Sequence, residues 1–159
     1  MEKFDKHGQT KLKSISFLIR PYQVKDKNRV IDLWIQCGLV VPANNPALDI
    51  DRKTSHSPEL LVGEMNDVII ASVMIGYEGH RGWINYLAVD PAYQRRGYAR
   101  QMMDEAEKRL NGLNCPKINL QVRESNTEVI QFYEKLGYKN DHVIGMGKRL
   151  FQDPAYEKQ

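Results

Sequence analysis

The sequence predicts an α+β domain built on a mostly antiparallel sheet, and three observations lead to this prediction. Two apolar segments, Glu59 to Met65 and Val68 to Tyr77, are separated only by Asn66-Asp67, which is typical of a β-hairpin. A third apolar segment, Trp83 to Val89, runs into a basic loop and then into an amphipathic helix. The chain has 159 residues, of which 42% are hydrophobic, so one domain with one core is sufficient.

The elements before the hairpin are expected from local patterns. Residues 1 to 13 show no periodicity and are expected to be a flexible extension, which leaves 14 to 159 as the domain. Apolar residues at helical spacing stop at Gly38, and two prolines with two asparagines then favour a loop. In chain order we expect a strand over 14–20, a helix over 25–37, a loop over 41–46 and a short helix over 49–55.

The elements after the basic loop alternate between helix and strand. A helix follows the loop, because Ala99, Met102, Met103, Ala106 and Leu110 form one apolar stripe. We then expect a strand over 117–122, a helix begun by a capping box of Ser125 and Glu128 and ended by Gly137, and closing strands from Tyr138 onward that include Val143, Ile144 and Met146.

Composition excludes several classes of protein. The net charge of +3 comes from 23 basic residues spread along the chain, so charge alone does not indicate nucleic-acid binding. Cys37 and Cys115 lack metal or redox spacing, which favours reduced thiols in a cytoplasmic protein over a disulfide, and no metal is expected. No apolar run approaches the roughly 20 residues of a membrane span, and residues 1–13 do not resemble a signal peptide.

The basic loop and the start of the next helix have the character of an anion-binding site. The first N–H groups of a helix lack intrahelical partners, and the helix dipole places partial positive charge beside them. Gly97 lets the backbone approach an anion closely, and Ala99 keeps the first turn small. Arginines at 95, 96 and 100 add charge around the loop.

Two motifs at the right separation resemble the GCN5-related N-acetyltransferase (GNAT) family. Gln94 to Ala99 has the Q-x-x-G-x-A form of the family's acyl-CoA-binding motif, between a strand and a helix as in the family. Downstream, Leu120 to Asn126 and Phe132 to Tyr138 resemble the family's strand, its Asn-started helix and its Tyr-x-x-x-Gly-Tyr ending. The resemblance extends over about 16–149. It implies a mixed sheet of six to seven strands flanked by about four helices.

The resemblance also implies where acetyl-CoA binds. In the family, two central parallel strands splay apart and pantetheine lies between them, which assigns its backbone partners here to Leu87 and Val89; their side chains would be core residues. Asn126 would contact pantetheine, although an asparagine at a helix start is also a good cap. The residues expected to hold the pyrophosphate are Gln94, Arg95, Arg96, Gly97, Tyr98, Ala99 and Arg100.

By the same resemblance Tyr133 is the general acid. It matches the family tyrosine that protonates the leaving thiolate, and a phenol with a pKa of about 10 suits that role. The alternative is an ordinary aromatic residue on the inner face of a helix.

The general base is not defined by the sequence. Two positions where branches of the family carry glutamate hold Gln121 and Trp83 here. A route through water could use Glu78 or His80, which lie beside the strand before the basic loop, or Glu64. Glu78 and His80 could equally be plain turn residues, and an acceptor amine of low pKa would need no strong base.

The acceptor pocket is expected along the first helix and its following loop, with Trp34, Asn45 and Tyr77 as its residues, although Trp34 could instead be a core residue. Several segments resemble a little-characterised bacterial YpeA-like branch of the family. The resemblance thus implies an acetyl-CoA-dependent N-acetyltransferase that acts directly on a primary amine of a small molecule or a peptide N-terminus, and a homodimer is compatible with it. The alternative is a non-catalytic acyl-CoA-binding module. A nucleotide-binding protein is disfavoured because no G-x-x-x-x-G-K-[ST] or G-x-G-x-x-G motif occurs.

Overall fold

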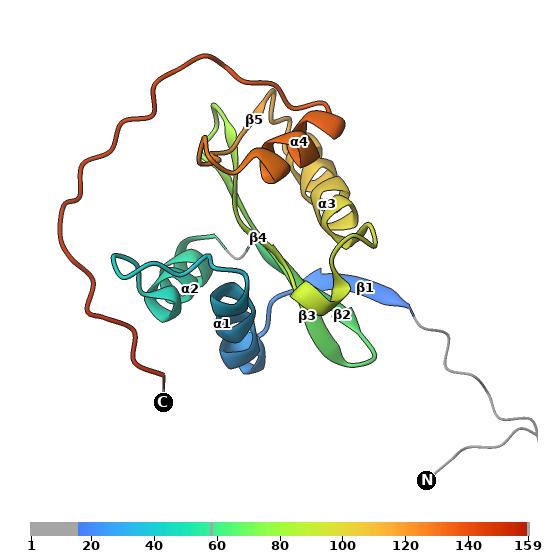
Figure 1. The fold of residues 1–159 in the computed structure, drawn as a ribbon, viewed down its shortest axis with the longest axis vertical. Helices are drawn as coiled ribbons and strands as arrows, with labels where there is room; N and C mark the ends of the chain where they lie inside the picture. Colours follow the sequence, from blue (N-terminus) through green and yellow to red (C-terminus); the bar gives the residue numbers. More distant parts are fainter. Residues whose placement is uncertain (1–15, 58, 159) are drawn as a thin grey trace, which may run out of the picture.

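The computed structural model describes residues 16–57 and 59–158, so the expected extension over 1–13 and the start of the first strand lie outside the described residues. Figure 1 shows the arrangement of the elements. In chain order they are β1 (Phe17–Pro21), the 3₁₀ turn η1 (Val24–Asp26), α1 (Lys27–Gln36), α2 (Pro46–His56), β2 (Leu60–Met65), β3 (Val68–Tyr77), β4 (Gly82–Val89), the 3₁₀ turn η2 (Pro91–Tyr93), α3 (Tyr98–Gly112), β5 (Ile118–Asn119) and α4 (Thr127–Lys135).

The described residues form one five-stranded sheet in the order β1-β2-β3-β4-β5. The first four strands are antiparallel, and Asn66 and Asp67 adopt positive φ angles in the predicted hairpin turn. β5 lies parallel to β4 and pairs with it only at Gly82–Ile118 and Trp83–Asn119. Beyond these pairs β4 continues without a strand partner on that edge among the described residues. The α+β prediction is therefore confirmed, with fewer strands than expected.

Helices cover both faces of the sheet, as Figure 1 shows: α3 and α4 lie on one face, α1 and α2 on the other. Each face has its own apolar core because side chains alternate across a strand. The core under α3 and α4 includes Leu61, Ala71, Val73, Ile75, Ile84, Met102, Met103, Leu110 and Tyr133, and the core under α1 and α2 includes Val30, Leu33, Trp34, Ile50, Leu60, Val62, Ile69 and Ala88.

A bulge in the middle of β4 changes which residues face which core. The register with β3 shifts between Ser72–Ala88 and Met74–Asn85, and Tyr86 has a φ of 50°, which is unusual for a residue other than glycine. Ile84 therefore faces α3, whereas Tyr86, two residues later, packs against the core under α1 and α2. Without the bulge the two side chains would lie on one face.

Buried polar contacts hold this bulge in place. The Trp34 indole N–H donates to Ser72 Oγ at 2.8 Å, and Ser72 Oγ donates to the backbone carbonyl of Tyr86 at 3.1 Å. The Trp34 and Tyr86 rings stack with centroids 3.9 Å apart. Trp34 and Ser72 are fully buried, so each bond replaces one that water would otherwise make.

The second helix begins earlier than predicted. The sequence prediction placed Pro46 in a loop and began the helix at Asp49, whereas α2 begins at Pro46. The Asn45 side chain caps this helix by accepting hydrogen bonds from the backbone N–H groups of Ala47 and Leu48. Proline is favoured in a first helical turn because its missing N–H would be unpaired there anyway.

The last predicted helix forms, but its start differs from the prediction. Asn126 is the N-cap of α4 and Ser125 precedes it, so the expected capping box of Ser125 and Glu128 is wrong; Glu128 instead pairs with Arg95. Gly137 does end this helix, with a φ of +93°. Its N–H donates to Glu134 and that of Tyr138 to Tyr133, as in a Schellman motif. The preceding strand, expected over 117–122, is reduced to β5.

The closing strands expected after Tyr138 are absent from the described structure. Residues 139–158, here called the C-terminal strap, run in extended form from α4 past α2 (Figure 1). Ile144 and Met146 are 90% and 93% exposed, so they add nothing to the core. Glycines at 145 and 147 disfavour a strand, and β5 offers only two residues for pairing. The strap is held to the domain by bonds of Asp141 to Lys117, Arg149 to the Ala43 carbonyl, Asp153 to Arg52, the Pro154 carbonyl to Asn45 and Lys158 to Asp32.

Replacing Ser72 with alanine tests the buried contacts of the bulge. Ser72→Ala leaves the buried Trp34 N–H without an acceptor, so we expect a loss of about 1–3 kcal/mol in the free energy of unfolding, measured by urea denaturation. Ser125→Ala, at an exposed position, should change it by less than about 0.5 kcal/mol. Equal stability of the two variants would contradict the role given to Ser72.

Candidate functional site

The basic loop presents free backbone N–H groups at the start of α3. Gly97 is the N-cap of this helix, with a φ of +83° and no side chain to cap the first turn. The first helical bond runs from the Gln101 N–H to the Gly97 carbonyl. Within the described part of the chain, the N–H groups of Tyr98, Ala99 and Arg100 have no hydrogen-bond acceptor. A Cβ on Gly97 would meet no atom within 4 Å, so the space beside it is open.

The loop that leads to this turn is braced by side chains. Asp90 accepts a hydrogen bond from the Ala92 N–H at 3.0 Å and pairs with Arg29 at 2.6 Å. Gln94 donates through Nε2 to the Val89 carbonyl at 2.9 Å. Gln94 thus fixes the loop against the end of β4 through the Val89 carbonyl, and both residues stay predictions as cofactor contacts.

The arginines of the loop lie at its surface. Arg95 has a φ of +62° and pairs with Glu128 of α4 at 3.2 Å, both side chains being more than 80% exposed. Such an exposed ion pair is weak, so Arg95 can bind another anion in place of Glu128. Arg96 lies over the Tyr93 ring, 5.7 Å from its centroid. Arg100, also exposed, follows in the first turn of α3.

Tyr133 lies on the same face of the sheet as the basic loop. Its side chain is 9% exposed and packs edge-on against the rings of Phe132 and Tyr138. Its hydroxyl has no hydrogen-bond partner among the residues that the structure describes. Burial alone raises the pKa of Tyr133 to about 12, so the phenol is protonated at neutral pH.

Asn126 begins α4 without using its side chain as a cap. It is the N-cap residue by position, yet its side-chain oxygen accepts no hydrogen bond from the helix. The side chain is exposed. The sequence left two roles open for the Asn126 side chain, a contact to pantetheine or a helix cap. The structure does not show the helix cap.

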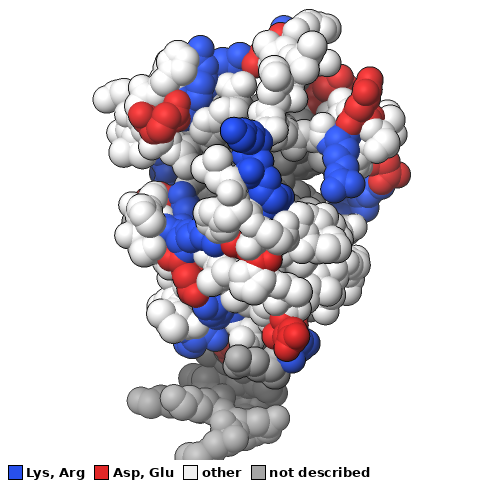
Figure 2. All heavy atoms as spheres, turned by 90° about the vertical axis from the view of Figure 1, so that its left-hand side faces the viewer, with Lys and Arg blue, Asp and Glu red and all other residues white. Residues whose placement is uncertain are grey.

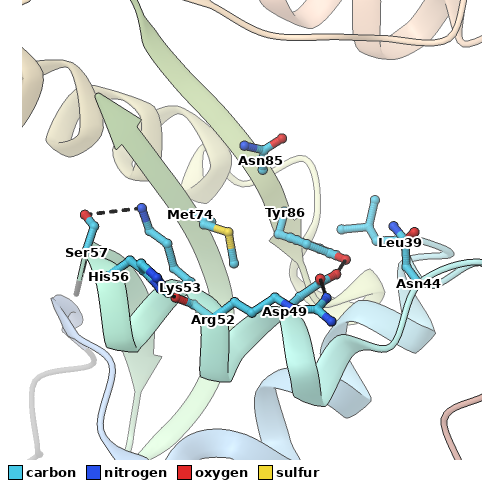
Figure 3. A pocket seen from close by; sticks show the side chains of 10 residues that line it. All are labelled: Leu39, Asn44, Asp49, Arg52, Lys53, His56, Ser57, Met74, Asn85 and Tyr86. Atoms are coloured by element: carbon cyan, nitrogen blue, oxygen red, sulfur yellow. Dashed lines mark hydrogen bonds and ion pairs between the residues drawn. The ribbon is translucent and has the colours of Figure 1, made fainter. Parts of the chain in front are cut away.

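A pocket of about 620 Å³ opens on the opposite face, between α2 and β4 (Figure 3). Tyr86 points from the β4 bulge toward α2, and its hydroxyl donates to Asp49 at 2.5 Å. Burial, followed by this bond to a carboxylate, raises the pKa of Tyr86 above its ordinary value. The other lining residues are Leu39, Asn44, Arg52, Lys53, His56, Ser57, Met74 and Asn85.

Three residues were predicted for the acceptor pocket, but none of them lines the pocket at Tyr86. Trp34 is fully buried beneath Tyr86 and is the core residue that the sequence left as its alternative. Asn45 is buried, caps α2 and donates to the Pro154 carbonyl, while its neighbour Asn44 lines the pocket. Tyr77, at the end of β3, donates to the Gly79 carbonyl.

The predicted bases also lie elsewhere. Glu78 and His80 are exposed in the turn between β3 and β4, where Glu78 accepts a hydrogen bond from the Arg81 N–H. Glu64, on β2, is engaged by Arg20 at 2.7 Å. The pocket residues Asp49, Arg52 and Tyr86 were missed by the sequence analysis. Their signal was the polar face of α2, where Asp49, Arg52, Lys53 and His56 recur at helical spacing.

Residues 16–57 and 59–158 contain no group of three or more His, Cys, Asp or Glu side chains placed to hold a metal ion. They also contain no helix that is both long and apolar enough to cross a bilayer.

The fold and site define an acetyltransferase of the GNAT type: helices on both faces of the sheet, a β4–β5 pair that separates, and a glycine turn with free N–H groups at α3. The model of the acetyltransferase (GNAT) family matches residues 28–138, more than half of the chain. The chain therefore belongs to this family, and it is an enzyme of the N-acetyltransferase class, whose members act on amine acceptors.

Curated relatives agree with this assignment. An acetyltransferase of Yersinia pestis (strain Pestoides F) is 49% identical over 139 residues, which cover 87% of this chain and 99% of the relative. An acetyltransferase of Pectobacterium atrosepticum is 48% identical with the same coverage.

Solved structures share the fold at lower identity. Ard1 from Thermoplasma volcanium has a TM-score of 0.70 at 22% identity, covering 77% of this chain and 82% of its own. AAC(6')-Iy, solved in complex with a bisubstrate analogue, CoA-S-monomethyl-acetylneamine, has a TM-score of 0.69 at 18% identity, covering 84% and 99%.

Proposed function

We propose that the protein transfers the acetyl group of acetyl-CoA directly to a primary amine of a small molecule or a peptide N-terminus. The observation that carries this proposal is the position of two openings on the two faces of the sheet. The free N–H groups of the Gly97 turn and Tyr133 lie on the α3 face, and the pocket at Tyr86 lies on the α2 face. The pocket is lined by Asn85 and Tyr86, and Gln94 of the basic loop donates to the Val89 carbonyl, so both places adjoin the part of β4 that β5 leaves unpaired.

The chain's residues fit the cofactor at this place. The N–H groups of Tyr98, Ala99 and Arg100 need acceptors, and a pyrophosphate supplies them beside the positive end of the α3 dipole. Arg95, Arg96 and Arg100 surround them with positive charge. From Ile84 to Val89 the free edge of β4 offers backbone partners for the amides of pantetheine, as expected for Leu87. Asn126, with its side chain uncommitted, faces solvent at the start of α4.

The reaction requires a neutral amine and a proton donor. The amine nitrogen attacks the thioester carbonyl, the C–S bond breaks, and the thiolate takes a proton while the amine loses one. Tyr133 is the donor in this proposal, because its raised pKa keeps it protonated and its hydroxyl has no hydrogen-bond partner in the part of the chain that the structure describes. Glu78 and His80 stay predictions for the base, and the geometry does not bring them to the pocket.

The proposed function is tested by two measurements on the same sample. Acetyl-CoA should raise the melting temperature, and thiol should be released when amines, polyamines or peptide N-termini are added. A stabilised protein that releases no thiol with any acceptor would favour a non-catalytic acyl-CoA-binding module. No change in melting temperature would overturn the role of the basic loop.

Substitution of Gly97 tests the cofactor site. Gly97→Gln adds a side chain where the pyrophosphate must approach, so we expect the affinity for acetyl-CoA to fall at least about a hundredfold, measured by calorimetry. Gly38→Gln is a matched control, since Gly38 also has a positive φ and open space around its Cβ. Each variant should lose about 1–2 kcal/mol of stability from the left-handed backbone. Equal affinities in the two variants would contradict the assignment.

Removal of the Tyr133 hydroxyl tests the general acid. Tyr133→Phe should lower kcat by about 10²-fold or more while leaving acetyl-CoA affinity and stability unchanged, because the hydroxyl donates to no group among the described residues. The wild-type enzyme should keep its proton donor up to about pH 11, since the pKa of about 12 leaves the phenol protonated below it.

Tyr138→Phe is the matched control, as its ring contacts that of Tyr133. It should keep kcat within about twofold and lose about 1 kcal/mol of stability with the bond to Glu107. A normal kcat in Tyr133→Phe would remove Tyr133 from the mechanism.

A further inference from the structure

The C-terminal strap extends the pocket at Tyr86 into a longer groove. A second pocket of about 580 Å³ lies between α2 and strap residues 147–151. The two pockets share Asn44, Asp49 and Arg52, so they are contiguous. The strap is fixed at this place, because Arg149 donates to the Ala43 carbonyl at 3.0 Å and Asp153 pairs with Arg52. The groove therefore has two ends, one at β4 and one at the strap.

The end at β4 is the end for the amine. Only there does the groove reach the strand whose edge β5 leaves free, beside the Tyr86 bulge. Asp49 lies next to it, with one carboxylate oxygen bonded to the Tyr86 hydroxyl. Its other oxygen is 3.5 Å from Arg52, a long and weak contact. A carboxylate placed in this way attracts a protonated amine.

The end at the strap carries an excess of positive charge, because its lining has Arg52, Lys148 and Arg149 against Asp49 and Asp153. Arg52 and Asp153 cancel each other through two short bonds of 2.6 and 2.9 Å. Lys53 turns into the domain, where it donates to the Ile75 carbonyl and burial lowers the pKa of its amine. Lys148 and Arg149 remain, both exposed, and neither forms an ion pair within the described residues. Figure 2 shows the face that carries the strap, with lysine and arginine side chains along its middle.

We propose that the acceptor carries an anionic group, a carboxylate or a phosphate, which Lys148 and Arg149 bind while its amine lies at Asp49 and Tyr86. This inference rests on the proposed N-acetyltransferase function and names its substrate class. Each of the two pockets, of about 620 and 580 Å³, has the volume of a site for a small molecule. A polyamine is disfavoured, because it would place a second ammonium group against Lys148 and Arg149.

Paired acceptors test the inference. We would compare 4-aminobutanoate with 4-aminobutanamide and 2-aminoethyl phosphate with ethanolamine, measuring thiol release from acetyl-CoA. The anionic member of at least one pair should have a kcat/KM about tenfold or more higher, and the pair that responds identifies carboxylate or phosphate. In each pair the neutral acceptor has the less basic amine, so a larger fraction of that amine is unprotonated and able to attack. A higher kcat/KM for the anionic acceptor therefore cannot come from amine reactivity.

A double variant assigns the preference to the strap. Lys148→Gln/Arg149→Gln should raise KM for the anionic acceptor about tenfold or more, change kcat little, and bring the ratio between pair members close to one. Lys25→Gln/Lys108→Gln removes the same charge from exposed positions away from the groove and should keep the preference. A merely structural role of the strap would lower kcat with both members of a pair.

The outcomes separate this inference from the proposed function. If acetyl-CoA neither raises the melting temperature nor loses its thioester to any acceptor, the proposed function fails and the inference with it. If acetyl-CoA binds and neutral acceptors are acetylated as well as anionic ones, only the anionic acceptor is overturned. Binding without transfer to any of these probes, or equal loss of preference in both double variants, also overturns it.

Discussion

The separation of β4 and β5 after two residue pairs is the constraint on which the rest of the site depends. A continuous pairing would satisfy the edge of β4 with backbone bonds and leave no place for another molecule between the strands. Because pairing stops at Trp83 and Asn119, the edge from Ile84 onward must find other partners. The two helix layers keep the strands in place on either side, so the opening is supported by the cores and costs little in packing.

The β4 bulge makes the two faces of the sheet different at this opening. One extra residue moves Tyr86 to the α2 face, although Ile84 faces α3, and the polar contacts of Ser72 with Trp34 and with the Tyr86 carbonyl fix that arrangement. The positive φ of Tyr86 is an unfavourable backbone conformation, which persists because the indole stack and the bond to Asp49 hold the side chain. The stacking of the buried Trp34 ring on the partly buried Tyr86 ring thus positions the Tyr86 hydroxyl in the pocket.

The sequence predicted what depends on local pattern and missed what depends on long-range packing. The hairpin at Asn66-Asp67, the helix after Gly97 and the end of α4 at Gly137 follow from turn and cap chemistry, which is local. The groove is different, because α2, the β4 bulge and the strap are brought together by tertiary contacts across more than a hundred residues, such as Arg149 to Ala43. Trp34 illustrates the limit: its helical spacing placed it on the inner face, but only the stack with Tyr86 shows that it is covered.

The proposed function divides binding of the two substrates between parts of the chain with different constraints. The proposed cofactor side uses backbone N–H groups, a glycine conformation and a helix dipole, which are properties of the backbone and depend little on exchangeable side chains. The proposed acceptor side uses side chains of α2 and of the strap, where the apolar residues from Val143 to Phe151 are exposed. Substitution of exposed strap residues such as Lys148 would therefore alter the proposed acceptor end at little cost in stability. Under the proposed function, this separation would let one acetyl-transfer centre serve different amines, and the motif at residues 94–99 would indicate the donor and give no information on the acceptor.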